Sequence, residues 1–150
     1  MLNPACPILG TRLSVVTFKQ NFRVRWVDTD IAGVMHYSNF LRYFEACEEE
    51  FYRSLGIPLN AIRDKYHIML PRIEAHCQYR AACRFDDLFE VALSAREVTE
   101  KTITYDFQLT RSEDNKLAAE GYLKCIAVNL EWKAVPLPDE FVELIRENIV

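Results

Sequence analysis

The hydrophobic period of the chain changes abruptly within residues 24–53, and this change constrains the fold more than any other feature. From Val16 to Trp26 the apolar residues fall mostly at even positions, which is typical of a strand with one buried face. Beyond Ser38 they recur three or four residues apart, as on one face of a helix, at Phe40, Phe44, Cys47, Phe51 and Leu55. Between the two patterns lies a tight acidic turn that contains Asp28, Asp30 and Gly33. The order predicts a strand, a turn and one long helix.

The expected helix has recognisable ends. Ser38 is a candidate N-cap, and Gly56 followed by Pro58 predicts the stop. At roughly 1.5 Å per residue this helix would be about 25 Å long. Its aromatic stripe requires a broad apolar surface to cover it.

The remainder of the chain predicts that such a surface is a sheet. Residues 59–70 are expected to be irregular or weakly helical, whereas a period of two returns after Pro71, in segments 72–80, 89–95, 103–109 and 117–130. Short polar segments at Arg84–Asp87, Thr99–Lys101 and Ser112–Asn115 are predicted to be hairpin connections. A short helix is expected after Pro138, with Phe141, Leu144 or Ile145, and Ile149 on one face. The predicted class is α+β, with a curved antiparallel sheet wrapped around the long helix.

The bulk properties limit the alternatives. A chain of 150 residues fits one domain, with residues 1–13 as a loose lead-in. The net charge of -4 argues against a nucleic-acid-binding protein. No apolar run approaches the ~18 residues of a membrane span, and the N-terminus lacks the pattern of a signal peptide. Five cysteines without a CxxC pair argue against a disulfide framework or structural zinc, which favours a cytoplasmic location.

A single sheet curled around one helix leaves an outer face and an exposed edge strand, which proteins usually cover. The last predicted strand is apolar on both sides, because Leu123 and Cys125 alternate with Tyr122, Ile126, Val128 and Leu130. We therefore expect a second subunit to cover part of the sheet, most simply in a two-fold dimer.

The acidic turn has three interpretations from its residues alone. Aspartate is common in turns because its side chain bonds nearby backbone groups, so a structural role for Asp28 or Asp30 is as well supported as a functional one. A calcium loop begins similarly, but Ala32 stands where an oxygen ligand belongs and Asn39 where the bidentate Glu should be. A hydrolytic site is the third interpretation, because a carboxylate lies just before the open amides of a helix N-terminus.

The segment VRWVDTDIAGVMHYSNFLRYFEA favours the third interpretation, because it resembles the signature of the hotdog-fold thioesterases of the 4-hydroxybenzoyl-CoA thioesterase type, including the acyl-CoA thioesterases found with the Tol–Pal system. The shared pattern is Asp-x-Asp-x-x-Gly with an apolar residue next, an aromatic or His pair, and a helix opening with Asn or Ser. The resemblance covers roughly residues 16–146, including the Phe85-Asp86-Asp87-Leu88 turn and the stretch Trp132–Pro138. It implies a hotdog fold and a thioester hydrolase.

The resemblance also assigns roles by position. It implies that Asp30 is the catalytic carboxylate, as general base on water or as nucleophile, and that the backbone N–H at Tyr37 polarises the thioester carbonyl. Gly33 and His36 are implied to lie at the substrate. Lys101 matches a position that contacts coenzyme A phosphates in some members, although a single exposed Lys is more often a solvated turn residue.

The chain departs from the family pattern in two places, at His36-Tyr37 and at Glu48, near which many relatives carry an Arg. The Tol–Pal-associated branch has a His where this chain has Tyr37, and here the His lies one place earlier, at His36. This departure brings the chain closer to the hydroxybenzoyl type. Glu45 could correspond to the helix carboxylate of another hotdog branch, but its place off the apolar stripe favours a solvated or interface role.

The resulting hypothesis is an acyl-CoA thioesterase for an aromatic or aliphatic acyl group, working as a dimer or a tetramer built from dimers. The acyl chain would lie beside the long helix at the subunit interface. Hydrolysis is expected to need no metal or bound cofactor, because coenzyme A enters as part of the substrate.

Several alternatives stay open. A thioesterase acting on acyl carrier protein would need a basic patch around the site. A catalytically silent hotdog protein that binds acyl-CoA or scaffolds partners is disfavoured by Asp30 with Gly33, and a dehydratase lacks a recognisable His–acid pairing. A serine hydrolase has no Gly-x-Ser-x-Gly support. Cys47 is expected to be a buried structural thiol, and His67 and His76 lack metal-ligand spacing, with His76 at the surface.

Overall fold

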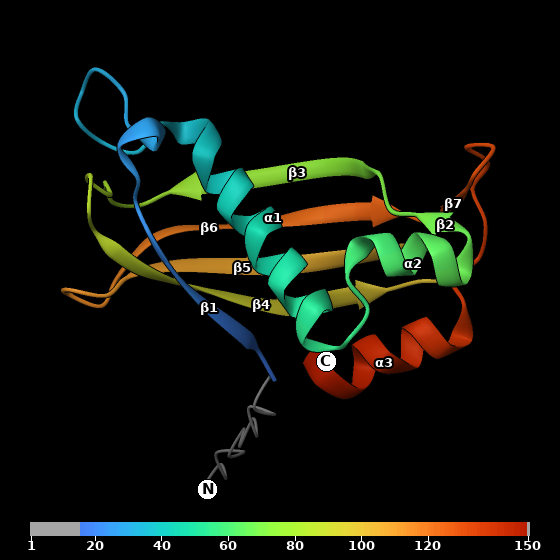
Figure 1. Cartoon of the computed structure of the whole chain (residues 1–150). Coiled ribbons are helices and arrows are strands. Elements are labelled where there is room, and N and C mark those ends of the chain that lie inside the picture. Colours follow the sequence, from blue (N-terminus) through green and yellow to red (C-terminus); the bar gives the residue numbers. More distant parts are fainter. Residues whose placement is uncertain (1–15, 150) are drawn as a thin grey trace, which may run out of the picture.

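The computed structural model describes residues 16–149, so the predicted lead-in at residues 1–13 lies outside the described residues. The elements follow one another along the chain as Figure 1 labels them. They are β1 (Phe18–Arg23), the short 3-10 helix η1 (Trp26–Asp28), α1 (Tyr37–Ser54), α2 (Leu59–Tyr66), β2 (Ile68–Met69), β3 (Arg72–Tyr79), β4 (Leu88–Val98), β5 (Thr102–Arg111), β6 (Lys116–Ile126), β7 (Val128–Asn129) and α3 (Asp139–Ile149). No helix among residues 16–149 is long and apolar enough to cross a membrane.

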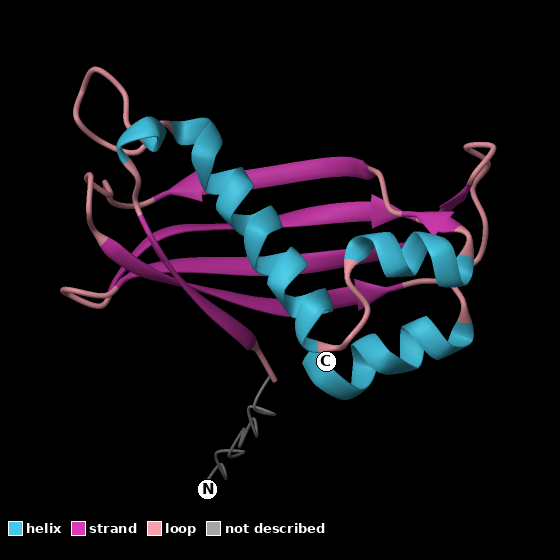
Figure 2. Ribbon diagram, viewed as in Figure 1, coloured by secondary structure: helices cyan, strands magenta, loops and turns pink. Residues whose placement is uncertain are grey.

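One antiparallel sheet carries the fold. Its strands lie in the order β1-β4-β5-β6-β3, and every neighbouring pair is antiparallel. Helix α1 lies across one face of this sheet, and α2, α3 and the small β2-β7 sheet gather at the end far from the α1 N-terminus (Figures 1 and 2). The predicted α+β class, with a sheet around one long helix, is confirmed.

The core lies between α1 and the inner face of the sheet. Phe44 of α1 stacks on Phe107 of β5, with ring centroids 4.8 Å apart, and Cys47 is fully buried beside Val91. The buried residues of the strands alternate as the period of two predicted: Phe89, Val91, Leu93, Ile103, Tyr105, Phe107, Leu109, Leu123 and Cys125. The helix stripe, the faces of the central strands and the structural burial of Cys47 are thus confirmed.

Two of the predicted strands were too long. The first strand ends at Arg23 instead of Trp26, because residues 26–28 turn into η1 and leave the Trp26 side chain 75% exposed. The last strand ends in the main sheet at Ile126. Residues 128–129 then pair with β2.

Two connections also differ from the expectation. Residues 59–66 form a regular helix, which ends where His67 adopts a left-handed conformation at φ 54°. The segment Arg84–Asp87 is not a hairpin, because β5 and β6 separate β3 from β4 in the sheet. It crosses the end of the sheet instead. The segments Thr99–Lys101 and Ser112–Asn115 are confirmed as hairpin connections.

Strand β3 is an edge strand, so its predicted inner face is poorly covered. Ile73 and Tyr79 are 54% and 47% exposed in the single chain. A close approach to β6 fixes its place, because a Cβ atom on Gly121 would lie 2.0 Å from the His76 carbonyl oxygen. The outer face is more polar than the last-strand pattern predicted, since Tyr122 there donates a hydrogen bond to Glu74 and packs under Arg96.

A buried ion pair inside the core was not predicted. Glu48 of α1 is 1% exposed, and Arg72 at the start of β3 donates to its Oε2 at 2.5 Å. Its other oxygen, Oε1, has no hydrogen-bond partner among the described residues. Burial raises the pKa of Glu48 to about 7, against the opposing charge of Arg72.

We expect the substitution Glu48→Gln to weaken the pH dependence of stability. A glutamate carboxyl ordinarily has a pKa of 4.5, whereas the pKa of Glu48 in the folded state is about 7, so the folded state binds more protons between these values. The stabilising contribution is therefore complete below pH 4.5 and is lost as pH rises through about 7. Between about pH 5 and pH 8 the natural protein should lose on the order of 2 kcal/mol more unfolding free energy than the variant in urea titrations. Equal losses would contradict this expectation, and the exposed Glu113→Gln is the control.

Candidate active site

The predicted acidic turn is a short closed loop between β1 and α1. The amide of Asp30 donates to the Val34 carbonyl, and the amide of Gly33 donates back to the Asp30 carbonyl, both at 2.9 Å. Gly33 adopts φ +74°, a left-handed conformation that residues with a Cβ rarely reach. A bridge between Thr29 and Met35 closes the base of the loop. The Asp-x-x-Gly spacing thus forms a tight turn with Asp30 at its start.

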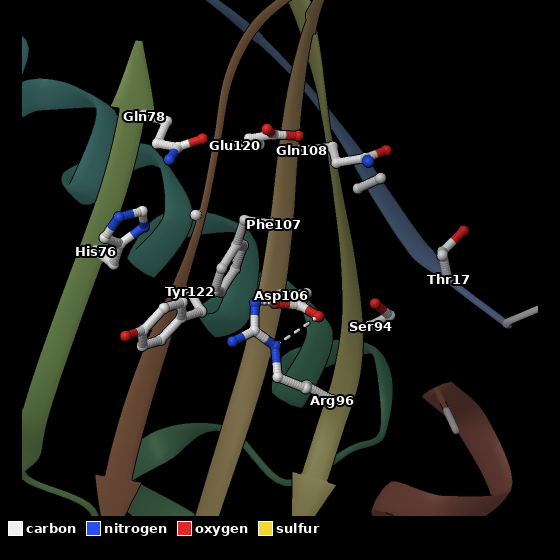
Figure 3. Close-up of a pocket in the computed structure, with 12 residues that line it drawn as sticks. Thr17, His76, Gln78, Ser94, Arg96, Asp106, Phe107, Gln108, Glu120 and Tyr122 are labelled. Carbon is white, nitrogen blue, oxygen red and sulfur yellow. Dashed lines mark hydrogen bonds and ion pairs between the residues drawn. The ribbon is translucent and has the colours of Figure 1, made fainter.

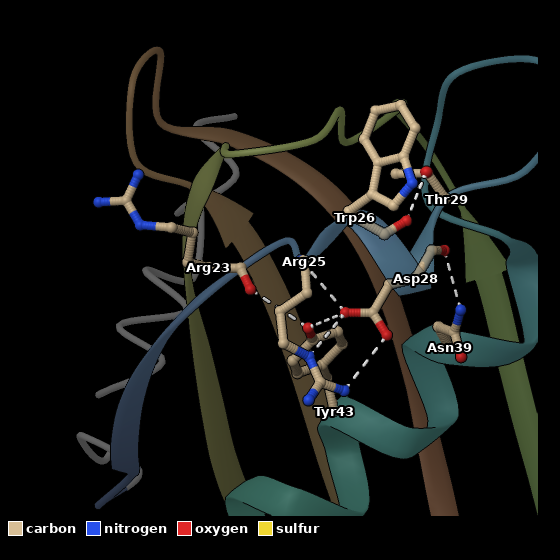
Figure 4. A network of polar contacts seen from close by, with 7 residues as sticks. All are labelled: Arg23, Arg25, Trp26, Asp28, Thr29, Asn39 and Tyr43. Carbon is tan, nitrogen blue, oxygen red and sulfur yellow. Dashed lines mark hydrogen bonds and ion pairs between the residues drawn. The ribbon is translucent and has the colours of Figure 1, made fainter.

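The two carboxylates of the turn have different surroundings. Asp28 is only 4% exposed and is surrounded by donors from Arg25 and Tyr43 (Figure 4). Burial alone would raise the pKa of Asp28, but the hydrogen bonds from Tyr43 and Arg25 outweigh it and hold the pKa below its usual range. Asp30 is half-buried, and its Oδ1 accepts a hydrogen bond from the Ala32 amide at 2.8 Å. Asp28 is therefore tied into the fold, whereas the hydrogen bonds of Asp30 lie within its own loop.

Helix α1 begins at Tyr37, one residue before Ser38, which the sequence predicted as its N-cap. The N-cap is His36 and not Ser38, and the His36 ring nitrogen Nδ1 accepts a hydrogen bond from the Ser38 amide at 3.3 Å. The amide of Met35 donates to the Cys83 carbonyl at 2.7 Å, which attaches the helix start to the segment after β3. The amide of Tyr37 has no acceptor among the described residues, as expected at the first turn of a helix. An open, positively polarised N–H group therefore lies at Tyr37.

Asp30 and Tyr37 line the same pocket, of about 400 Å³, which Val34, Met35, Phe40, Tyr79, Arg80, Ala81 and Ala82 complete. Tyr79 forms one wall, because its hydroxyl donates to the Tyr37 carbonyl at 3.1 Å and its ring packs edge-on against Phe40. The loop, the helix start and the end of β3 thus meet around one concave surface. A carboxylate and an open helix amide in one pocket can activate a nucleophile and stabilise a developing negative charge.

The other predicted site residues lie at different distances from this pocket. Gly33 shapes the turn. The His36 ring caps α1, and its centroid lies 4.4 Å from that of the Tyr37 ring. Lys101 lies in the β4–β5 hairpin, at the far end of β4 from the loop, and the 11 residues of β4 span roughly 35 Å at about 3.3 Å per residue. Within one chain, Lys101 is not brought to Asp30.

Tyr79 and Arg80 were not predicted to line the site. Arg80 forms an ion pair with Glu120 at 2.6 Å on the neighbouring strand. Tyr79 and Arg80 reach the pocket because β3 ends beside the N-terminus of α1. In the sequence, this is indicated only by the position of Tyr79 at the end of a predicted strand.

A larger pocket, of about 470 Å³, lies on the outer face of the sheet (Figure 3). Its charged groups are paired: Arg96 donates to Asp106 at 3.0 Å and lies over the ring of Tyr122, on which His76 stacks. His76 is exposed there, as predicted. No helix N-terminus points into this pocket, and no group of three or more His, Cys, Asp or Glu in the described part of the chain could hold a metal ion. The pocket at Asp30 therefore offers the more reactive arrangement.

Known proteins resemble this chain in sequence and in structure. Residues 24–145 match the family described as the "Thioesterase-like superfamily". The acyl-CoA thioesterase YbgC of Haemophilus influenzae is 27% identical over 119 residues, which cover 79% of this chain and 86% of that protein.

Two solved structures share the hotdog architecture. One, of an Aquifex aeolicus protein, has a TM-score of 0.80 at 32% identity and covers 85% of this chain and 98% of that one. The other, of the 1,4-dihydroxy-2-naphthoyl-CoA thioesterase from Synechocystis, has a TM-score of 0.81 at 25% identity and covers 87% and 96% of the two chains.

Proposed function

The chain belongs to the thioesterase-like superfamily of thioester hydrolases, and on that premise we propose that it hydrolyses an acyl-CoA at the pocket between Asp30 and the start of α1. The observation that carries the proposal is that Asp30, a carboxylate, and Tyr37, whose backbone amide is open at the helix start, line the same pocket. Acyl-CoA thioesterase activity is supported at the level of the family. The residue roles below are our own inference.

Hydrolysis at this pocket requires a nucleophile and a site for the oxyanion. Asp30 takes a proton from water, whose oxygen attacks the thioester carbonyl carbon, or it attacks that carbon directly and water cleaves the resulting anhydride. The carbonyl oxygen becomes negative in either route and accepts a hydrogen bond from the Tyr37 amide, where the helix dipole favours negative charge. The C–S bond breaks as this adduct collapses, and the thiolate of coenzyme A leaves and takes up a proton; in the direct route this departure forms the anhydride, which water hydrolyses afterwards. No step uses a metal or a bound cofactor.

The walls of the pocket are compatible with an apolar acyl group. Met35, Phe40 and Tyr79 line the pocket with apolar surface, which accommodates aromatic or aliphatic carbon equally. Coenzyme A enters as part of the substrate. Gly33 and His36 act by shaping the loop and the helix start, and Lys101 could contact the phosphates of coenzyme A only from another subunit.

A two-fold dimer would complete this site. Strand β3 has a free edge, and antiparallel pairing of two β3 strands around Ala75 would bring Tyr79 of one copy opposite Pro71 of a second copy, next to Arg72. Arg72 lines an apolar pocket of about 390 Å³ beside α1, with Leu59, Ile62, Arg63, Glu45, Ile68, Met69, Leu70, Pro71 and Trp132. The acyl group at Asp30 could then extend into this pocket, beside the long helix of the second copy.

We expect Ala75→Lys at the centre of β3 to break the dimer. Two like charges would meet across the two-fold axis, and charged edge residues oppose strand pairing. Light scattering should give twice the 17.5 kDa of one chain, or a higher even multiple, for the natural protein and one chain for the variant. The control Asn21→Lys, on the other edge strand, should leave the assembly intact. An Ala75→Lys protein that stays oligomeric would rule out pairing through β3.

The function is tested by thiol release from a panel of aromatic, short aliphatic and long aliphatic acyl-CoAs, with the same acyl groups on acyl carrier protein beside them. We expect turnover of at least one acyl-CoA by the natural protein. Turnover of the carrier-bound forms alone would move the substrate to acyl carrier protein. Tight binding of an acyl-CoA without release of thiol would instead identify a non-catalytic binding protein.

A further inference from the structure

The side chain of Asp28 ties the acidic loop to α1. Its carboxylate accepts a hydrogen bond from the Tyr43 hydroxyl at 2.5 Å and from the Arg25 amide at 3.2 Å (Figure 4). The guanidinium Nε of Arg25 lies 3.3 Å from the same oxygen. A buried carboxylate is costly without such partners, so this arrangement holds Asp28 firmly.

The backbone of Asp28 is fixed as well. Its carbonyl accepts hydrogen bonds from the His36 amide at 2.8 Å and from the Asn39 side-chain amide at 2.9 Å. Asp28 precedes Asp30 by two residues, and His36 directly precedes Tyr37. One residue therefore joins both ends of the loop segment that carries the proposed carboxylate and the proposed oxyanion donor.

Tyr43 is the buried partner in this network. Its side chain is 7% exposed, whereas the Arg25 side chain is 70% exposed and its ion pair is screened by solvent. Burial and the hydrogen bond to Asp28 raise the pKa of Tyr43 to about 12, so the hydroxyl stays a donor throughout the neutral range. The Arg23 carbonyl lies farther from the hydroxyl, at 3.2 Å, so the single proton is directed to Asp28.

We propose that Tyr43, acting through Asp28, is a positioning residue that holds the Asp30 carboxylate and the Tyr37 amide in their relative places. This inference rests on the proposed function. Tyr43 does not line the pocket, so it has no contact with substrate of its own. Loss of its hydroxyl removes the shortest hydrogen bond to Asp28 Oδ2, so that only the longer contacts with Arg25 hold this oxygen and the loop can shift against the helix start.

The consequence is specific to the chemical step. A displacement of about 1 Å between reacting groups can cost on the order of 100-fold in rate, whereas the walls that bind the acyl group stay in place. We expect kcat to fall roughly 10- to 100-fold in Tyr43→Phe, with KM changed less than about threefold.

The matched control is Tyr52→Phe. Tyr52 lies on the same helix and is fully buried, and its hydroxyl bonds the Tyr105 hydroxyl at 2.6 Å. Each variant loses one buried hydroxyl, so both should lose thermal stability, but nine residues of helix, about 13 Å, separate Tyr52 from Tyr43. Only Tyr43→Phe should lower kcat.

The experiment measures kcat and KM on the best acyl-CoA of the panel, the melting temperature, and amide hydrogen exchange of residues 29–37. We expect faster exchange at the His36 and Asp30 amides in Tyr43→Phe alone. Unchanged kcat in Tyr43→Phe, or equal losses of kcat in the two variants, would overturn the proposed role. If loop exchange accelerates but neither Tyr43→Phe nor natural protein releases thiol, the coupling of Tyr43 to the loop stands and the proposed function fails.

Discussion

Replacement of Asp30 by Asn should lower kcat by about 10²–10⁴-fold while the protein remains folded. The amide oxygen of Asn can still accept the hydrogen bond that Asp30 Oδ1 receives from the Ala32 amide, so the loop keeps its geometry. What the variant loses is the negative charge that removes a proton from water or attacks the carbonyl. Both routes need the carboxylate, so both predict the loss.

The matched control for this variant is Asp64→Asn on α2, which removes one exposed carboxylate away from the pocket. It should keep the kcat of the natural protein. Thiol release under saturating acyl-CoA gives kcat, and circular dichroism verifies the fold of each variant. If Asp30→Asn were as active as Asp64→Asn, Asp30 would be a turn residue with no part in the reaction.

Replacement of Tyr37 by Pro should remove the proposed oxyanion donor without breaking the helix. Tyr37 is the first residue of α1, where proline is favoured because that N–H has no partner within the helix. The preceding residue, His36, already has φ -61° and ψ 138°, which a following proline accepts. The expected loss in kcat is on the order of 10²–10³-fold, the usual effect of deleting one oxyanion donor.

The companion variant Tyr37→Ala separates the amide from the side chain. Alanine keeps the N–H group and removes the phenol ring, which is 65% exposed. We expect kcat within about tenfold of the natural protein for Tyr37→Ala, so the ratio of the two variants measures the amide itself. Equal activity of Tyr37→Pro and Tyr37→Ala would show that this N–H does not stabilise the oxyanion.

The sequence predicted those parts of the fold that depend on local periodicity. The stripe that includes Phe44 and Cys47 and the alternation along β4 and β5 are properties of neighbouring residues, and each lies as expected. The order of the strands is not local. The segment Arg84–Asp87 has hairpin composition, yet it crosses the end of the sheet because β3 pairs with β6 on the far side.

The environment of each carboxylate could not be predicted in the same way. Asp28 and Asp30 are two residues apart and equivalent by pattern, and they differ because Tyr43, 15 residues from Asp28, reaches only the first of them. Glu48 is the first of three successive glutamates in the sequence, and it can be buried because Arg72, 24 residues later, pairs with it. Such distinctions depend on contacts that exist only once the helix lies on the sheet.

The cap of α1 shows the same limit on a smaller scale. Ser38 has the preferred residue type, but the loop closure between Asp28 and His36 places the first helical residue at Tyr37. The His36 ring then takes the capping role. Tyr37 remains the residue at the helix start that lines the pocket with Asp30.

The most direct test of the proposed mechanism is a structure of the protein with an inert acyl-CoA analogue in which a methylene group replaces the thioester sulfur. Benzoyl and hexanoyl analogues represent the aromatic and aliphatic cases. We expect the ketone oxygen within about 3 Å of the Tyr37 amide nitrogen, and the Asp30 carboxylate beside the carbonyl carbon or a water next to it. An analogue whose carbonyl lies in the outer-face pocket at Arg96, or in the pocket at Arg72 without contact to Asp30, would contradict the mechanism.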